Sequence, residues 1–397
     1  MRRGIGLFAL ILLAAPAPAP ALAQGPEPAP PGMSSGQTRE RIAKAIEQND
    51  AANVVAATEL LAIMGAGLTE ASQARVAPFF STSQMDGLKQ RFAENAQPLS
   101  ASTVFAHVPV EHRLVEGLAH DPATGRLFAG TVVDGDLLVS EGLGWQPYEM
   151  PEGIGGLFGM KVDPGRRRLW IASGVVDQVA DKSAISPGLL EMDADTLELI
   201  DVKFMPAGAQ GSPGDVAIGQ DGTVYVSDGL KGAIYRCPPG CPTLETLVPE
   251  GPLTSPQGMV LSRDGKSLIV ADYVGGLARV DLATGEPRWL EMRDAAMLDG
   301  IDGLLRYDQW LIAIQNGTSP RRIIRITLNE DESRVDSVEV MERANPAWGE
   351  PTLATATGGR LLYVADSQWE VWGEGGVVKQ GEKPRATAVR AMPLPVR

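Results

Sequence analysis

The sequence predicts a six-bladed β-propeller that is preceded by a small α-helical N-terminal segment. Three observations predict this fold: one unit is repeated six times from Val115 onward, its copies recur every 42 to 56 residues, and strand-like segments flank the series. That period is typical of four-stranded propeller blades and is too long for leucine-rich or tetratricopeptide repeats. A β-sandwich is the alternative fold, but a sandwich does not require one repeated unit.

The repeated unit consists of an alternating strand, a polar turn rich in Asp and Gly, and a strongly hydrophobic second strand. Turns such as Asp221-Gly222 and Asp264-Gly265 supply residues that suit tight hairpins. The six copies are VEGLAHDPATGRLFAG (115–130), LFGMKVDPGRRRLWIAS (157–173), GDVAIGQDGTVYVSD (214–228), QGMVLSRDGKSLIVAD (257–272), DGLLRYDQWLIAI (302–314) and EPTLATATGGRLLYVAD (350–366).

The two ends of the repeat region are predicted to close the ring. A strand-like segment, Thr103 to Val110, precedes the first copy, and Ala386 to Leu394 follows the last copy. Pairing of these two segments in one sheet would remove the exposed edges of the propeller. We therefore expect the propeller to span residues 102–397.

Residues 1–23 are predicted to be a signal peptide. Arg2 and Arg3 precede an apolar run, Ile5 to Ala15, that is too short to cross a bilayer comfortably. The small residues of Ala21-Leu22-Ala23 place the expected cleavage after Ala23. An uncleaved anchor is the alternative. The pattern predicts a periplasmic or secreted protein that is free of the membrane after cleavage.

Between the signal and the propeller lie a Pro-rich linker (residues 24–35) and a helical subdomain (residues 36–98). We expect the linker to be extended and not to pack. One helical unit cannot bury its own apolar face, so the subdomain is expected to lean on the propeller and to offer a surface for a protein partner. The candidate N-caps are Thr38, Asp50 and Thr69, and a fourth helix is expected over Met85 to Phe92.

The formal net charge of −14 excludes one class of partner. A strongly acidic chain cannot neutralise a row of phosphates, so the sequence predicts no nucleic-acid binding. The acidity suits a protein that meets small molecules, cations or basic partners.

The chain contains two cysteines, Cys237 and Cys241, in the segment CPPGC. Export to an oxidising compartment and the bend produced by the intervening prolines and glycine predict a local disulfide. A metal site would need further thiol or imidazole ligands nearby, and the sequence around this segment has none.

The residue that begins each copy is expected to face the central axis, because the innermost strand of a blade lines the channel. Carboxylate and amide oxygens that converge there would suit a hard divalent cation such as Ca²⁺. Asp215 and Asp299 lie beside this ring in the sequence. In the alternative interpretation, the acids only cap strand ends. The six positions are Glu116, Phe158, Gly214, Gln257, Asp302 and Glu350.

The copies resemble those of the SMP-30/gluconolactonase/luciferin-regenerating-enzyme family, over about Val115 to Asp366. The phrases that carry the resemblance are EGLAHDPATGRLFAG, SPQGMVLSRDGKSLIVADYVGGLARVDLATG and LDGIDGLLRYDQWLIAIQNG. The resemblance implies a six-bladed propeller with one axial divalent metal held by a Glu, two Asn and an Asp. It also implies hydrolysis of sugar lactones or related esters, with the Asp as base.

The ligand set of the family is only partly present in this sequence. The family's Glu falls on Glu116 and its Asp on Asp302, with Asp299 as the alternative register, whereas the two Asn positions fall on Gly214 and Gln257. The sequence thus departs from the pattern at two of four ligand positions. The resulting predictions are Asp302 as the catalytic base, Glu116, Gln257, Asp302 and Glu350 as metal ligands, and Asp215, Asp299, Phe158 and Trp369 as substrate contacts.

Two functions remain open at this point. One is a metal-dependent hydrolase that acts on a lactone or ester of a small oxygenated substrate, and it is favoured by the ring of acids. The other is a non-catalytic binding propeller, which is favoured by the two missing Asn ligands and by the added helices.

Overall fold

The computed structural model describes residues 29–395, apart from residues 31, 142–143, 184 and 210. The predicted signal peptide and the first residues of the predicted linker lie outside the described residues. Within the described part of the chain, no helix has the length and apolar character needed to cross a bilayer.

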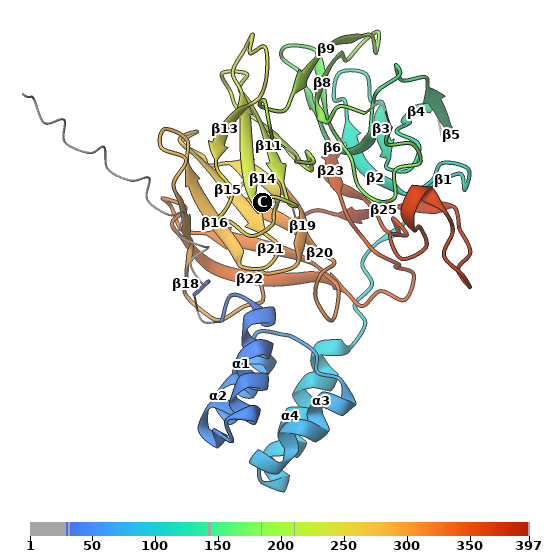
Figure 1. The fold of residues 1–397 in the computed structure, drawn as a ribbon. Helices are drawn as coiled ribbons and strands as arrows, with labels where there is room; N and C mark the ends of the chain where they lie inside the picture. Colours follow the sequence, from blue (N-terminus) through green and yellow to red (C-terminus); the bar gives the residue numbers. More distant parts are fainter. Residues whose placement is uncertain (1–28, 31, 142–143, 184, 210, 396–397) are drawn as a thin grey trace, which may run out of the picture.

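The predicted six-bladed propeller is confirmed by six sheets, each with four antiparallel strands, that follow one another along the chain (Figure 1). Blades 1 and 2 are formed by β2 (Val115–His120), β3 (Leu127–Thr131), β4 (Leu137–Glu141), β5 (Gly144–Tyr148) and by β6 (Gly156–Asp163), β7 (Arg168–Gly174), β8 (Gly188–Asp193), β9 (Leu199–Phe204). Blades 3 and 4 are formed by β10 (Val216–Ile218), β11 (Val224–Asp228), β12 (Ala233–Cys237), β13 (Glu245–Val248) and by β14 (Pro256–Leu261), β15 (Ser267–Asp272), β16 (Gly276–Asp281), β17 (Pro287–Trp289).

Blades 5 and 6 complete the ring. Blade 5 contains β19 (Ile301–Tyr307), β20 (Trp310–Gln315), β21 (Arg322–Leu328) and β22 (Arg334–Arg343), and a short fifth strand, β18 (Glu291–Met292), pairs in parallel with β22. Blade 6 contains β23 (Ala354–Thr357), β24 (Arg360–Val364), β25 (Thr387–Pro393) and β1 (Thr103–Val108).

The ring is closed as the sequence predicts. Strand β1, which precedes blade 1 in the chain, pairs antiparallel with β25 and so becomes the outer strand of blade 6. The first and last parts of the propeller therefore share one sheet. This pairing covers strand edges that would otherwise be open to other chains.

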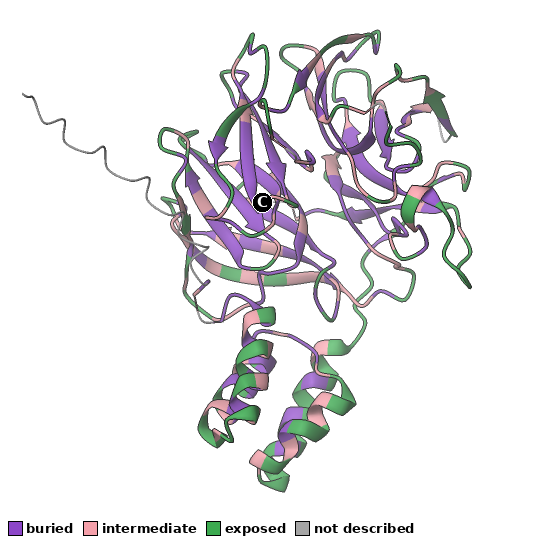
Figure 2. Cartoon of the chain, viewed as in Figure 1, coloured by how far each residue is buried: buried purple, intermediate pink, exposed green. Residues whose placement is uncertain are grey.

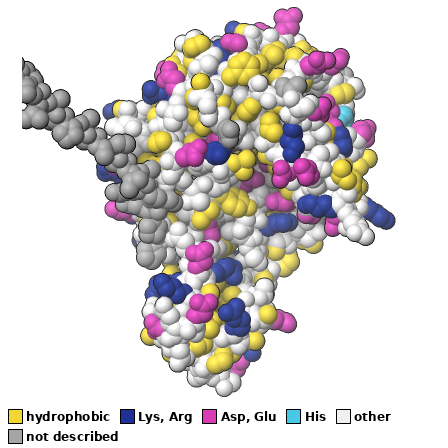
Figure 3. Space-filling model, viewed as in Figure 1, with side chains coloured by type: hydrophobic (Ala, Val, Ile, Leu, Met, Phe, Trp, Pro, Cys, Tyr) yellow, Lys and Arg dark blue, Asp and Glu magenta, His cyan; other side chains and the backbone are white. Residues whose placement is uncertain are grey.

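Burial explains why the second strand of each copy is the most hydrophobic. Every residue of β15 is buried, as is every residue of β3 and β11, and Figure 2 shows the strands as the most buried part of the molecule. The second strand has neighbours on both sides within its own sheet and packs on both faces against the adjacent blades, so both of its faces are apolar. Both signs of charge are scattered over the face of the molecule drawn in Figure 3.

Four α-helices form the module that hangs below the propeller in Figure 1: α1 (Ser35–Glu47), α2 (Ala51–Ile63), α3 (Glu70–Val76) and α4 (Thr82–Ala96), with a short 3₁₀ turn, η1 (Ala77–Phe79), after α3. The predicted caps Asp50 and Thr69 are confirmed. The prediction for Thr38 is wrong, since Ser34 caps α1 and the Thr38 hydroxyl donates to the Ser34 carbonyl from within the helix.

The end of the predicted linker packs against the propeller, which corrects the expectation that it would not. Met33 is fully buried in a cluster with Leu277 and Leu298. Its carbonyl accepts a hydrogen bond from Leu298 N at 2.8 Å. A single apolar side chain can thus fix a Pro-rich segment to the propeller, because burial of a methionine side chain stabilises the folded state by about 1.5–3 kcal/mol.

Candidate functional site: an acidic axial cavity

All six ring positions predicted from the sequence line one cavity of about 320 Å³. A cavity of this size suits a small ligand. The remaining lining residues come from the loops that precede the inner strands or follow the second strands of the blades. They are Val176, Ser212, Pro213, Gly229, Leu230, Ser255, Tyr273, Asn316 and Trp369.

Glycines that follow the ring residues bring the inner strands close to the axis. A Cβ atom on Gly117 would lie 2.1 Å from the carbonyl oxygen of Phe158, and one on Gly258 would lie 2.4 Å from Leu304 N. Any larger residue would push neighbouring blades apart. In three copies, a polar ring residue is therefore followed by a glycine that lets two blades approach closely. These pairs are Glu116-Gly117, Gln257-Gly258 and Asp302-Gly303.

Glu116 is buried and is held by an aromatic neighbour. The indole Nε1 of Trp369 donates a hydrogen bond to Glu116 Oε2 at 2.9 Å. The Trp369 ring is also stacked on Phe158, with 6.5 Å between ring centroids. Trp369 comes from the loop after β24, so blades 1, 2 and 6 meet at this point of the cavity.

Asp302 is the end of a short hydrogen-bonded chain. Asn316 Nδ2 donates to Asp302 Oδ2 at 2.7 Å, and the Tyr273 hydroxyl donates to Asn316 Oδ1 at 2.9 Å. The chain fixes the orientation of the Asp302 carboxyl group. The Asn316 amide has a second N–H within the cavity, and such a donor can hold an oxygen atom of a ligand.

Burial raises the pKa of the acids of the cavity. Burial raises the pKa of Asp302 to about 7, and the Glu350 and Asp215 carboxylates add to the rise while the bond from Asn316 opposes it. Burial also raises the pKa of Glu116 well above its usual range, with Asp302 as the next largest cause. The pKa of Glu350 is raised by burial too, against the opposing charge of Arg321. Two carboxyl groups with different proton affinities can serve as an acid and a base.

Asp215 does not line the axial cavity. It lies in a space of about 10 Å³ with Leu118 and Met160, which are two residues beyond the ring positions of their strands. Its Oδ1 accepts from Val216 N at 2.8 Å. Asp215 therefore lies outside the lining of the axial cavity, where its carboxylate contributes to the raised pKa of Asp302, and its predicted contact with substrate stays a prediction.

Asp299 is also misplaced by the sequence prediction. Its Oδ2 accepts hydrogen bonds from Ser35 Oγ at 2.9 Å and from Gly36 N at 2.8 Å, so it holds the N-terminus of α1 against the propeller. Ser34 Oγ is 3.4 Å from the same oxygen. Asp299 is neither a cavity residue nor an alternative to Asp302, because it anchors the helical module.

The side chains of the cavity do not fit the metal site that the resemblance implies. Gly214 offers no oxygen ligand, and the amide nitrogen of Gln257 donates to Ser255 Oγ at 3.1 Å. Across the described parts of the chain, no three His, Cys, Asp or Glu side chains are grouped so that they could hold an ion. We therefore derive no reaction step that passes through a metal.

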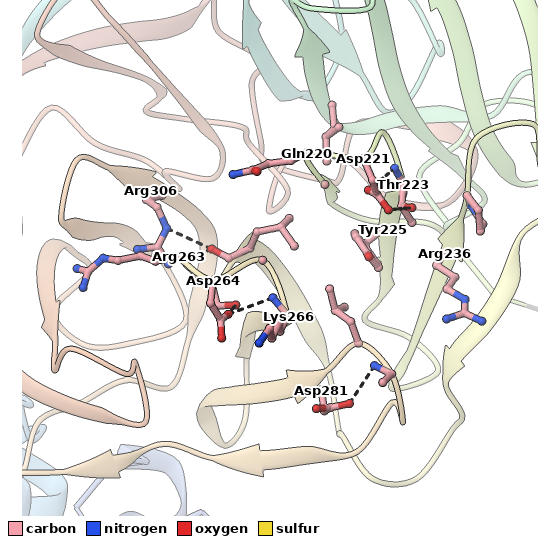
Figure 4. A pocket seen from close by; sticks show the side chains of 18 residues that line it. Gln220, Asp221, Thr223, Tyr225, Arg236, Arg263, Asp264, Lys266, Asp281 and Arg306 are labelled. Atoms are coloured by element: carbon pink, nitrogen blue, oxygen red, sulfur yellow. Dashed lines mark hydrogen bonds between the residues drawn. The ribbon is translucent and has the colours of Figure 1, made fainter.

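A larger hollow of about 1010 Å³ lies between blades 3 and 4, at the turns that join first and second strands (Figure 4). Its acids serve the turns: Asp264 Oδ1 accepts from Lys266 N at 3.0 Å and Asp281 Oδ1 from Ala283 N at 2.9 Å. Arg306 is paired with the buried Glu332 at 2.7 Å. These charges already have structural partners, so the smaller axial cavity is the candidate site.

The predicted disulfide between Cys237 and Cys241 is present. It ties the end of β12 to the following loop, on the outer part of blade 3 and away from the residues that line the axial cavity. The described residues contain no other cysteine.

No protein-family model matches the chain, and no curated protein matches it either. Solved structures that are similar include a gluconolactonase from Xanthomonas campestris, with 17% identity over 76% of this chain and 98% of that chain and a TM-score of 0.49. A luciferin-regenerating enzyme has 11% identity over 72% and 95% of the two chains, with a TM-score of 0.48. The PQQ-bound aldose sugar dehydrogenase of Streptomyces coelicolor has 17% identity over 75% and 99%, with a TM-score of 0.48. Likeness at this level assigns no activity.

Proposed function

We propose that this protein is an exported hydrolase that binds a small oxygenated substrate in the axial cavity and cleaves a lactone or ester bond. The observation that carries the proposal is the convergence of Glu116 and Asp302, from the first and the fifth copies of the repeat, on one cavity. Export rests on the signal-like segment at residues 1–23.

In the proposed reaction, Asp302 is the general base. A water molecule adds to the substrate carbonyl carbon while the Asp302 carboxylate takes one proton from that water. The carbon–oxygen bond of the lactone or ester then breaks, and the leaving oxygen takes a proton from the Glu116 carboxyl group. The products are a carboxylic acid and an alcohol, and the proton on Asp302 returns to Glu116 or to water.

The other cavity side chains support this chemistry. Asn316 and Tyr273 keep the Asp302 carboxyl in place, and donors such as the Gln257 amide are available for the oxyanion that forms at the carbonyl. Burial raises the pKa of Glu116 well above its usual range, which favours the protonated form that an acid requires, and a pKa of about 7 leaves part of Asp302 ionised at neutral pH, as a base requires.

The test is lactone and ester hydrolysis by the purified mature protein, followed by acid release. Wild type should hydrolyse at least one lactone, and Asp302→Asn should lower kcat by about 10²- to 10⁴-fold while the circular-dichroism spectrum stays unchanged. Asn is of equal size but cannot accept a proton. If Asp302→Asn equals wild type on every lactone that wild type cleaves, the assignment of Asp302 is wrong.

A second candidate is a binding propeller without catalysis. It is favoured by the bonds that already occupy one oxygen of Glu116 and one of Asp302, from Trp369 and Asn316. This candidate predicts that ligands bind in the cavity without turnover. Hydrolysis of any lactone that Asp302→Asn abolishes would eliminate it.

A further inference from the structure

The axial cavity has two chemically different walls. One wall is acidic and polar and is supplied by blades 4, 5, 6 and 1, through Gln257, Tyr273, Asp302, Glu350 and Glu116. The other wall is supplied by blades 2 and 3 and is mostly apolar. Its members are Phe158, Val176, Pro213 and Leu230, together with Gly214, Gly229 and the hydroxyl of Ser212.

The two walls face each other across the axis. Each inner strand packs against the next in chain order, from β2 through β6, β10, β14, β19 and β23 and back to β2. In a ring of six blades, blades 2 and 3 therefore lie opposite blades 5 and 6. A ligand whose reactive carbonyl meets Asp302 can extend its opposite end across the axis to the apolar wall.

Leu230 is the most informative residue of the apolar wall. It is 68% exposed, although it is a large hydrophobic side chain that lines the cavity. The loop backbone holds Leu230 in this position, because the buried Asp228 accepts hydrogen bonds from Leu230 N at 3.2 Å and from Lys231 N at 3.1 Å. A fixed, exposed leucine at a cavity mouth offers apolar surface that a ligand can cover.

Phe158 and Val176 supply further apolar surface to this wall. Phe158 is buried at its edge of the cavity, and its ring stacks with that of Trp369 with 21° between the ring planes. Val176 is only partly buried and lies in the loop after β7. Together with Leu230, these side chains supply apolar surface to the same cavity.

We infer that the substrate is a lactone or ester with an apolar alkyl arm of about two to six carbons, which lies along Phe158, Val176 and Leu230 while the carbonyl faces Asp302. This inference rests on the proposed function and deepens it. A polyhydroxylated sugar lactone fits less well, because hydroxyl groups placed against the apolar wall would lose their hydrogen bonds to water without replacement.

The experiment compares γ-butyrolactone with its γ-alkyl homologues up to γ-decalactone, and with D-glucono-δ-lactone as the hydrophilic substrate. For wild type, kcat/KM should rise by about fourfold for each added methylene until the wall is covered. Equal kcat/KM along the series, or a preference for D-glucono-δ-lactone, would overturn the inference and leave the proposed hydrolase intact.

The matched variants are Leu230→Ser and Val377→Ser. Val377 is 66% exposed but does not line the cavity. Leu230→Ser should flatten the rise of kcat/KM with chain length, and Val377→Ser should show the same rise as wild type. A rise that is unchanged in Leu230→Ser would place the arm elsewhere and refute the inference.

A binding measurement separates failure of this inference from failure of the proposed function. γ-Lactams of the same chain lengths cannot turn over under these conditions, so their affinity can be measured by calorimetry even if no lactone is hydrolysed. Affinity that increases with chain length in wild type but not in Leu230→Ser supports the apolar arm. Affinity that is independent of chain length refutes it, whatever the hydrolysis assay shows.

Discussion

The two hollows of this propeller contain similar residues and use them in opposite ways. In the hollow between blades 3 and 4, Asp221, Asp264 and Asp281 accept hydrogen bonds from turn backbone or side-chain groups, which lower their pKa. In the axial cavity, burial and neighbouring carboxylates raise the pKa of Glu116 and Asp302. The larger hollow thus holds acids that stabilise turns, and the smaller one holds acids that are available for chemistry.

The difference shows that the partners of a carboxylate indicate its role better than the size of the space around it. An Asp that accepts bonds from the backbone two or three residues later is part of its turn. An Asp that accepts one bond from an amide and faces other acids destabilises the folded protein. Such an arrangement indicates a functional role and not a structural one. The following predictions test this comparison.

Among the variants that compare the two hollows, the largest effect is expected for Glu116→Gln. Gln cannot release a proton to the leaving oxygen, so kcat on lactones should fall by about 10²-fold or more, as measured by acid release. Asp264→Asn in the outer hollow should stay within about twofold of wild type. Equal losses in the two variants would show that the two hollows do not differ in function.

Restoring the family's amides should create an ion site. A Cβ atom on Gly214 would meet its nearest neighbours at 3.6 Å or more, and it would lie 4.0 Å from Gln257 Oε1, so a side chain fits there. The double variant Gly214→Asn/Gln257→Asn should be stabilised by about 2–3 kcal/mol when Ca²⁺ is a hundredfold above its Kd. Thermal unfolding with and without CaCl₂ measures this change, with Gln257→Asn as the control. An equal rise in the unfolding temperature of wild type on addition of CaCl₂ would contradict the conclusion that its cavity side chains do not fit an ion.

The two sets of acids should shape the pH dependence of stability in opposite directions. Because the folded-state pKa of Asp302 is raised to about 7, the folded protein keeps a proton that the unfolded chain releases, and stability falls as pH rises from about 4 to 7. The lowered pKa of Asp264 contributes stability that is lost as pH falls below its unfolded value. Urea unfolding across this range should show a shallower fall in Asp302→Asn, whereas Asp264→Asn should change only the acid side. A steeper fall in Asp302→Asn would contradict the raised pKa.

The smallest effect is expected for Asp264→Ala. Its carboxylate accepts from Ser262 Oγ at 2.6 Å and from Lys266 N at 3.0 Å, at an exposed turn. The free energy of unfolding should fall by no more than about 1 kcal/mol, as measured by urea denaturation, with lactone hydrolysis unchanged. A loss of hydrolysis would mean that the turn has a role in the site.

The repeat allowed the ring to be predicted from the sequence. Because each copy begins an inner strand, equal positions such as Glu116 and Asp302 had to meet near the axis, and the structure brings them together. The pairing of β1 with β25 followed from the same logic. The aromatic Trp369 could also be named, since it lies in an irregular loop after a second strand.

Residues outside the repeat could not be placed in this way. Tyr273 and Leu230 reach the cavity because the end of each second strand pairs with the start of the first, as Pro256 does with Asp272. The repeat predicts this strand pairing, but it does not predict which residue of the following loop points into the cavity. Asp299 was misjudged because its partners, Ser35 and Gly36, lie more than 260 residues earlier, in a segment without any repeat.

A crystal structure of the wild-type protein with bound γ-decalactam tests the central claim most directly. We expect the lactam carbonyl beside Asp302 and the alkyl arm along Phe158 and Leu230. Electron density for the ligand only between blades 3 and 4, or Glu116 and Asp302 on separate outer surfaces, would contradict the assignment of the axial cavity as the functional site.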